Sequence, residues 1–151
     1  MTEQATVHAS AVLVGARAVL IRGPSGSGKS RLARDLIETA RGGPGFARLI
    51  GDDRVHLEAA GGRLLVRPAA ALAGLLEVRG LGLLRLPHEP SAVVDLVVDL
   101  AAVDARRLPE PDQQHTEIAG IVLPRLGVAA DDAALPRVLA HLISGRARAP
   151  L

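Results

Sequence analysis

The 151-residue chain is poor in several residue types, and each absence narrows what the protein can be. It has no cysteine, tryptophan or tyrosine, and Phe46 is its only aromatic residue. Disulfide bonds and cysteine-based metal sites are therefore excluded, and nucleic-acid bases have no aromatic platform to stack on. No apolar run is long enough to span a membrane, and residues 1–15 lack the basic segment of a signal peptide. We therefore expect neither a membrane partner nor a nucleic-acid partner.

Lysine is almost absent as well. Of the 18 basic residues, Lys29 is the only lysine, and the other 17 are arginine. They nearly balance 16 acidic residues, which leaves a net charge of only +2. The isoelectric point near 10.3 reflects the late titration of arginine and the lack of tyrosine and cysteine, so it does not indicate a basic binding surface.

The single lysine stands in a glycine-rich segment that fits the nucleotide-binding Walker A pattern, G-x-x-x-x-G-K-[ST]. The segment consists of Gly23, Pro24, Ser25, Gly26, Ser27, Gly28, Lys29 and Ser30. Backbone N–H groups of such a P-loop surround a phosphate, where a compact ammonium fits and a planar guanidinium does not. Ser30 is placed to give its hydroxyl to Mg²⁺. The sequence therefore predicts a site for ATP and Mg²⁺, and the need for ATP predicts a cytoplasmic location.

The residues on either side of the loop predict the strand and the helix that a phosphate site requires. Residues 16–22 are typical of a short buried strand, and residues 30–39 of a helix with one apolar face. Residues 6–14 predict an earlier, antiparallel strand, joined to the next by a tight turn at Gly15. A hairpin is thus expected to lead into the loop.

The rest of the chain predicts an α/β fold with a mixed sheet, many strands and only two convincing helices. Further strands are expected at residues 47–51, 55–58, 63–66, 75–82, 92–100 and 118–123, the fourth of them running into a glycine-rich loop, and a break is expected at residues 42–45. The second helix is expected over residues 135–143, with Ile143 on its apolar face and Gly145 as its stop. Residues 1–151 are interpreted as a single P-loop kinase domain.

Phosphoryl transfer also needs a carboxylate for the metal and a group that accepts the proton of the attacking hydroxyl. Asp52 and Asp53, at the end of a predicted strand, are the first candidates. Asp95 and Asp99 compete with them, because an apolar strand that ends in Asp is also a typical metal-binding signature. Since the alternation of that strand places Asp95 and Asp99 on its exposed face, we favour Asp52 and Asp53.

Four segments, in this order, resemble the catalytic domain of HPr kinase/phosphorylase, a bifunctional enzyme that acts on a serine of the phosphocarrier HPr. They are His8, the loop 23–30, residues 49–53, and residues 77–84, which contain Glu-Val-Arg-Gly-Leu-Gly, close to a signature of that family. The resemblance covers residues 7–86 and, more weakly, residues 120–126. It implies a fold similar to that of phosphoenolpyruvate carboxykinase, with a P-loop that follows a hairpin.

The resemblance also implies how the cofactors are held. Lys29 is expected to contact the β- and γ-phosphates of ATP. Ser30 and Glu77 are expected to hold Mg²⁺, with Asp53 near the metal. The implied partner is HPr or an HPr-like phosphocarrier, and the enzyme is expected to be a homo-oligomer that regulates phosphotransfer in carbohydrate metabolism.

For the chemistry, the resemblance implies that Asp52 is the base that takes the serine proton and that His8 lies beside it. Arg79 is expected to neutralise charge on the phosphoryl group. Relative to the family, the chain has no room before residue 6 for an N-terminal domain. It also lacks a Pro-Gly-Arg-Asn-type segment, so we expect weak or absent phosphorylase activity, with Arg125 as the only nearby substitute for the missing arginine.

Two other functions stay open at this point. One is a non-catalytic module that binds ATP and docks on a partner. The other is a P-loop kinase for a small molecule, for which Arg106 and Arg107 are the only tight basic pair available to a lid. A GTPase is not expected, because the chain has no Asn-Lys-x-Asp motif for the base.

Overall fold

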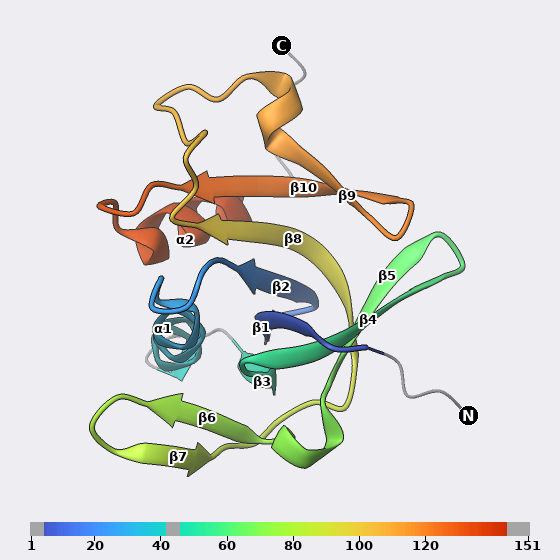
Figure 1. Ribbon diagram of the computed structural model, residues 1–151, viewed down its shortest axis with the longest axis vertical. Coiled ribbons are helices and arrows are strands. Elements are labelled where there is room, and N and C mark those ends of the chain that lie inside the picture. Colours follow the sequence, from blue (N-terminus) through green and yellow to red (C-terminus); the bar gives the residue numbers. More distant parts are fainter. Residues whose placement is uncertain (1–4, 42–45, 145–151) are drawn as a thin grey trace.

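Strands dominate the computed structural model, which describes residues 5–41 and 46–144 (Figure 1). One eight-stranded sheet contains β1 (Val7–Val14), β2 (Arg17–Arg22), β3 (Ala47–Gly51), β4 (Arg54–Ala60), β5 (Arg63–Pro68), β8 (Ala92–Leu100), β9 (His115–Ile118) and β10 (Ile121–Val128). A separate hairpin is formed by β6 (Leu75–Val78) and β7 (Gly82–Arg85). The two α-helices are α1 (Lys29–Arg41) and α2 (Ala134–Ser144), and short 3-10 turns lie at Ala70–Leu72 and Pro111–Gln114.

The sheet is mixed, as predicted. β1 and β2 form an antiparallel hairpin around Gly15, whose φ of 61° suits a tight turn, and β2 leads into the glycine-rich loop before α1. β2 and β8 run parallel, as do β8 and β10. The predicted hairpin that leads into the loop is therefore confirmed.

Five strands of the sheet also close into a ring. β1 pairs with β2 and β4, β5 pairs with β4 and β8, and the parallel pairing of β8 with β2 completes the circuit. In Figure 1, β8 curves from its place beside β2 toward β5. Successive strand residues point to opposite faces, so Leu20 of β2 packs on one face while Val19 and Ile21 pack on the other. The face of Leu20 belongs to a cluster shared by all five ring strands.

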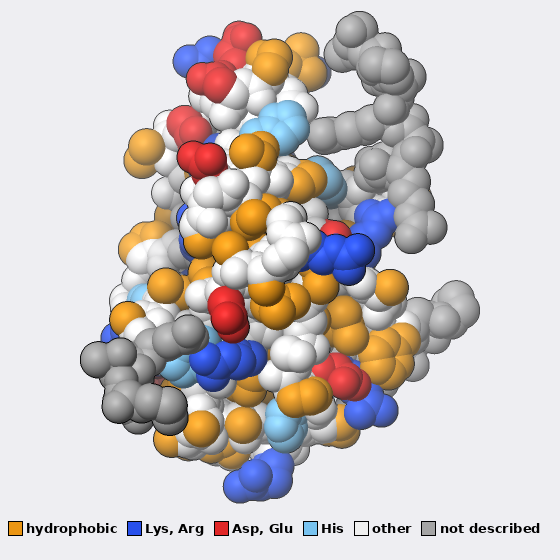
Figure 2. Space-filling model, turned by 90° about the vertical axis from the view of Figure 1, so that its right-hand side faces the viewer, with side chains coloured by type: hydrophobic (Ala, Val, Ile, Leu, Met, Phe, Trp, Pro, Cys, Tyr) orange, Lys and Arg blue, Asp and Glu red, His pale blue; other side chains and the backbone are white. Residues whose placement is uncertain are grey.

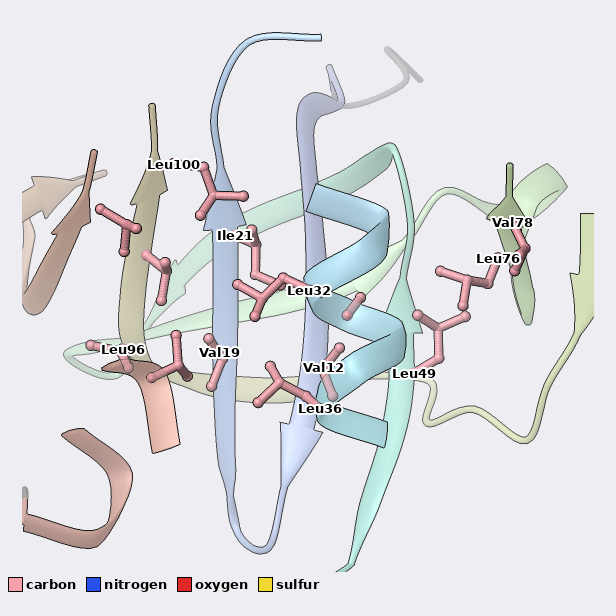
Figure 3. Close-up of a cluster of buried hydrophobic side chains, with 14 residues drawn as sticks. Val12, Val19, Ile21, Leu32, Leu36, Leu49, Leu76, Val78, Leu96 and Leu100 are labelled. Atoms are coloured by element: carbon pink, nitrogen blue, oxygen red, sulfur yellow. The ribbon is translucent and has the colours of Figure 1, made fainter. Parts of the chain in front are cut away.

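Helix α1 covers the other face of the sheet. Figure 3 shows Leu32 and Leu36 of α1 against Val12, Val19 and Ile21 of β1 and β2. Both leucines are almost completely buried, as their helical spacing predicted. Because each buried leucine contributes about 1.5–3 kcal/mol, this contact fixes the start of α1, and with it the loop, against the end of β2.

Helix α2 forms as predicted, but its apolar face is shorter. Leu135, Val138, Leu139 and Leu142 pack on the same cluster as α1. Ile143 is 82% exposed, so its predicted burial is wrong: in the last turn of the helix, Leu142 packs on the cluster and Ile143 points away from it. The expected helix stop at Gly145 and the expected break at residues 42–45 lie outside the described residues.

Two predicted strands turn out to be hairpins. Residues 118–123 were expected to form one strand, but the chain reverses there between β9 and β10, and Ile118 faces Ile121 across the ladder. Ala119 and Gly120 both have positive φ, 52° and 81°, which is typical of a two-residue hairpin turn and invisible to apolar periodicity. In the same way, residues 75–82 were expected to form one strand followed by a loop, but the strand ends at Val78 and the chain turns back to form β7 beside β6.

The surface shows no concentration of one charge on the face drawn in Figure 2. Basic side chains lie there among acidic and hydrophobic ones, in keeping with their scatter along the sequence. In the described part of the chain, neither helix has the length and apolar character needed to cross a membrane.

Candidate active site

The glycine-rich loop occupies the turn between β2 and the first residue of α1. A Cβ on Gly23 would lie 2.6 Å from Ser27 Oγ and 3.1 Å from the carbonyl oxygen of Leu100, so the close approach to the end of β8 admits only glycine. Gly26 and Gly28 have positive φ values of 80° and 100°. The loop therefore takes a path that side chains at these positions would oppose.

Lys29 spans this loop from inside. Its side chain is buried, and Nζ donates to the carbonyl oxygens of Gly23 at 2.8 Å and Pro24 at 3.1 Å. An ammonium has three donors, so one remains for another acceptor. Ser27 Oγ is also buried and has no hydrogen-bond partner. Together with the N-terminus of α1, whose first turn contains no acidic residue, these groups suit an anion such as a phosphate.

Asp52 follows β3 and joins four elements of the fold at one carboxylate. Its Oδ1 accepts hydrogen bonds from Ser30 Oγ of α1 and Ser10 Oγ of β1, each at 2.7 Å. Its Oδ2 accepts from the backbone N–H of Glu77 in β6 at 3.2 Å. Only 4% of Asp52 is exposed. Asp52 and Glu77, although 25 residues apart in the sequence, thus meet through the backbone of Glu77.

Asp53 points to a different place from its neighbour. The N–H of Arg54 bonds to the carbonyl of Asp52 at 2.8 Å, and Asp53 between them has a φ of 68°. This is the geometry of a tight three-residue turn, which is uncommon and strained for a non-glycine residue. The turn sends Asp52 inward, while Asp53 is exposed and its Oδ1 lies 2.7 Å from His8 Nε2. The prediction that His8 lies beside Asp52 is therefore wrong, because the turn gives that place to Asp53.

The remaining two predicted site residues lie on the hairpin of β6 and β7. The Glu77 side chain is exposed, and only its backbone N–H reaches Asp52. Arg79 is exposed in the turn after β6, and within the described residues its guanidinium forms no ion pair. The structure thus brings the backbone of Glu77 to the site and leaves Arg79 outside the contacts around Asp52.

Asp99 has a role that the sequence prediction missed. It was expected on an exposed face, but its side chain is only 18% exposed and accepts hydrogen bonds from Arg22 at 2.7 and 2.9 Å and from Arg125 at 2.6 Å. Burial raises the pKa of Asp99, but the two guanidinium groups outweigh it and hold the pKa below its ordinary value. Because Arg22 immediately precedes Gly23, the pair anchors the beginning of the loop to the end of β8.

Arg125 uses most of its hydrogen-bond donors in this network. It also donates to both carboxylate oxygens of Asp104, at 3.0 and 2.9 Å, and to the carbonyl of Gln113 at 3.0 Å. With its bond to Asp99, it uses four of the five N–H donors of a guanidinium. The hydrogen bond with Asp104 raises the pKa of Arg125, against the opposing effect of burial. Arg125 therefore ties β10 to the loop after β8.

A divalent cation fits part of this site. Ser30 and Asp52 supply adjacent hydroxyl and carboxylate oxygens, the ligand type that Mg²⁺ prefers. The described residues contain no group of three acidic, His or Cys side chains able to hold a metal by themselves. This donor set therefore suits Mg²⁺ bound together with phosphate oxygens and water, which is its usual mode in phosphoryl-transfer enzymes.

A cleft of about 490 Å³ opens beside the loop and was not predicted. It lies between the loop, α1 and the segment that links β10 to α2, and Arg31, Asp35, Ala101 and Leu135 are among its lining residues. Its walls come from segments about 100 residues apart, so no local sequence signal reveals it. Ser10 was missed as well; the only signal was a polar residue in an apolar strand.

Comparison with known proteins identifies the family to which this fold belongs. Residues 1–145 match the family described as the HPr Serine kinase C-terminal domain. The chain belongs to this family. It is 30% identical over 139 residues to HPr kinase/phosphorylase of Streptococcus sanguinis and 33% identical over 140 residues to that of Neisseria meningitidis serogroup C. The alignments cover 85% and 86% of this chain but only 43% and 42% of those proteins, so the chain spans less than half of their length.

A solved structure gives the same fold. The Hpr(Ser) kinase/phosphatase from Coxiella burnetii superimposes with a TM-score of 0.73 over 94% of this chain and 95% of that one, at 24% sequence identity. The predicted α/β fold with a mixed sheet is thereby confirmed.

Proposed function

We propose that this chain is an ATP- and Mg²⁺-dependent protein serine kinase that phosphorylates HPr or an HPr-like phosphocarrier. The observation that carries the proposal is the contact between Ser30 and Asp52, which joins the helix after the glycine-rich loop to an acidic strand end. Asp53, the residue after Asp52, is paired with His8. Membership of the HPr serine kinase family supports the class of substrate.

The geometry favours roles for the two aspartates that are exchanged relative to the sequence prediction. Asp52 is buried against Ser30, so Ser30 and Asp52 would hold Mg²⁺, with Glu77 close by. Asp53 is exposed, and its Oδ2 has no partner among the described residues, so Asp53 would take the proton of the substrate serine. An ionised carboxylate only accepts hydrogen bonds, so His8 Nε2 carries the proton in the pair and holds Asp53 in place.

In the proposed reaction, the serine hydroxyl loses its proton to Asp53 as its oxygen bonds to the γ-phosphorus of ATP. The bond from that phosphorus to the β–γ bridging oxygen breaks, and ADP leaves. Lys29, released from the loop carbonyls, would balance charge on the β- and γ-phosphates. Bound Mg²⁺ would neutralise the phosphate oxygens. Arg79 remains a proposed further cation for the phosphoryl group.

The test is to incubate the protein with ATP, Mg²⁺ and the HPr-like proteins of its host, and to locate phosphate by mass spectrometry. We expect phosphoserine on the phosphocarrier, and none with Lys29→Ala, which loses the only ammonium in the loop. Absence of Mg²⁺-dependent ATP binding to the unaltered protein in calorimetry would end the proposal.

Two variants separate the aspartates. Asp53→Asn should bind ATP and Mg²⁺ normally but lose transfer, because an amide cannot accept the serine proton. Asp52→Asn should raise the Mg²⁺ concentration that half-maximal ATP binding requires. The reverse pattern would restore the roles expected from the sequence.

Several finer statements belong to the same proposal: weak or absent phosphorylase activity, likeness to phosphoenolpyruvate carboxykinase, a homo-oligomer, a cytoplasmic location, and one kinase domain over residues 1–151. A non-catalytic ATP-binding module is the alternative that the exposed position of Glu77 favours. ATP binding without phosphate transfer to any HPr-like protein would select it.

A further inference from the structure

Ser10 is a buried polar residue with an unusual position. The described chain buries three polar or charged residues, Ser10, Lys29 and Asp52, and the other two belong to the proposed site. Ser10 lies in the middle of β1 and is completely inaccessible to solvent. Its hydroxyl donates to Asp52 Oδ1 at 2.7 Å and accepts from the backbone N–H of Asp53 at 3.3 Å. One atom therefore touches both acidic residues.

The hydrogen bonds at Asp52 show what this contact does. A carboxylate offers about four acceptor positions, two on each oxygen. Ser10 and Ser30 occupy both positions of Oδ1, and the Glu77 N–H occupies one of Oδ2. One position on Oδ2 remains for a cation or its water. Without Ser10, Oδ1 would also have an open position, and the carboxylate could rotate.

Ser10 also bears on the strained turn. The N–H of Asp53 belongs to the residue with a φ of 68°, and the Ser10 hydroxyl is its hydrogen-bond acceptor. The carbonyl of Asp53 is held from the same strand by the N–H of Ala9 at 3.1 Å. β1 thus holds both backbone polar groups of Asp53, and such strain persists only where its surroundings enforce it.

We propose that Ser10 is a positioning residue for the phosphoryl-transfer site. Its hydroxyl fixes the orientation of the Asp52 carboxylate toward Mg²⁺ and holds the turn that separates Asp52 from Asp53. The inference rests on the proposed function. It requires a group that donates and accepts at one atom, which threonine provides and valine or alanine does not.

The test compares Ser10→Thr with Ser10→Val, which have the same shape and differ in the hydroxyl, and adds Ser10→Ala, which introduces no extra atoms. ATP binding is measured by calorimetry across a Mg²⁺ titration, alongside phosphate transfer and thermal unfolding without Mg²⁺. The Val and Ala variants should need at least roughly tenfold more Mg²⁺ for half-maximal ATP binding, because removing a hydrogen-bond partner of a metal ligand usually lowers metal affinity by that factor. The Thr variant should have nearly the same Mg²⁺ requirement as the unaltered protein.

Three results decide the matter. If Ala, still folded by thermal unfolding, keeps the original Mg²⁺ requirement, Ser10 is not a positioning residue. If Thr and Val weaken binding equally while Ala does not, volume is responsible and the inference is equally overturned. If Ala and Val shift the Mg²⁺ requirement and Thr does not, it stands. Binding of ATP with Mg²⁺ is measured separately from phosphate transfer. Absence of phosphate transfer by the unaltered protein would therefore overturn the proposed function without deciding the role of Ser10.

Discussion

Replacing Asp99 by asparagine should destabilise the fold through the beginning of the glycine-rich loop. Asp99 accepts three hydrogen bonds from the guanidinium groups of Arg22 and Arg125. Asparagine keeps the shape but loses the charge, and its amide N–H₂ group faces guanidinium donors that need acceptors. The two arginines would then have no ionised partner at the end of β8, apart from the bond of Arg125 to Asp104.

The size of the effect follows from exposure. Breaking a fully buried ion pair costs about 3–5 kcal/mol, because the remaining charge has no solvent. Here Arg22 is 34% exposed and can regain water, whereas Arg125 is 13% exposed but keeps Asp104. We therefore expect a loss of about 2–3 kcal/mol in the free energy of unfolding, the range of hydrogen bonds to charged groups, or roughly 5–10 °C in melting temperature.

Urea unfolding at several pH values checks this reasoning. The pKa of Asp99 is lowered in the folded state, so its contribution is present above the ordinary pKa near 3.9 and disappears as pH falls through the folded-state pKa. The difference in free energy of unfolding between the unaltered protein and Asp99→Asn should thus be largest near neutral pH and become smaller below about pH 4. Glu58→Gln, the same change from carboxylate to amide at an exposed position of strand β4, is the control and should stay within about 0.5 kcal/mol. Equal effects of the two substitutions, or a difference that does not narrow in acid, would refute the role assigned to Asp99.

Two further predictions concern the loop and the reverse reaction. Gly23→Ala should weaken ATP binding in calorimetry more than Gly26→Ala, because a Cβ at Gly23 would meet Ser27 and the end of β8, while one at Gly26 meets no atom within 4 Å; equal losses would contradict this. Phosphoserine-HPr with high phosphate should release pyrophosphate much more slowly than the forward reaction runs, because Arg125 is occupied by two aspartates and is not available to a second anion. Comparable rates would show that another residue supplies the missing cation.

The sequence alone determined the parts of the protein that depend on local order. The hairpin, loop and first helix follow from apolar spacing and glycine placement over about 35 consecutive residues, and such short-range signals do not depend on the rest of the chain. The position of Lys29 in the loop was equally readable, because the motif carries its own geometry. Burial of Leu32 and Leu36 followed from their spacing on one helix face.

Only the tertiary structure decided where each acidic side chain points. Asp52 and Asp53 are neighbours with the same side chain, so periodicity cannot separate them; the positive φ of Asp53 sends one inward to Ser30 and the other outward to His8. The sequence did not reveal the hydrogen bonds of Asp99 for a related reason. Its strand position indicates an exposed face, but Arg22 and Arg125, 77 and 26 residues away, meet it there. Contacts between distant segments depend on how the strands are ordered in the sheet. Arg22, Asp99 and Arg125 meet because their strands β2, β8 and β10 are parallel neighbours, which the sequence of any one strand does not reveal.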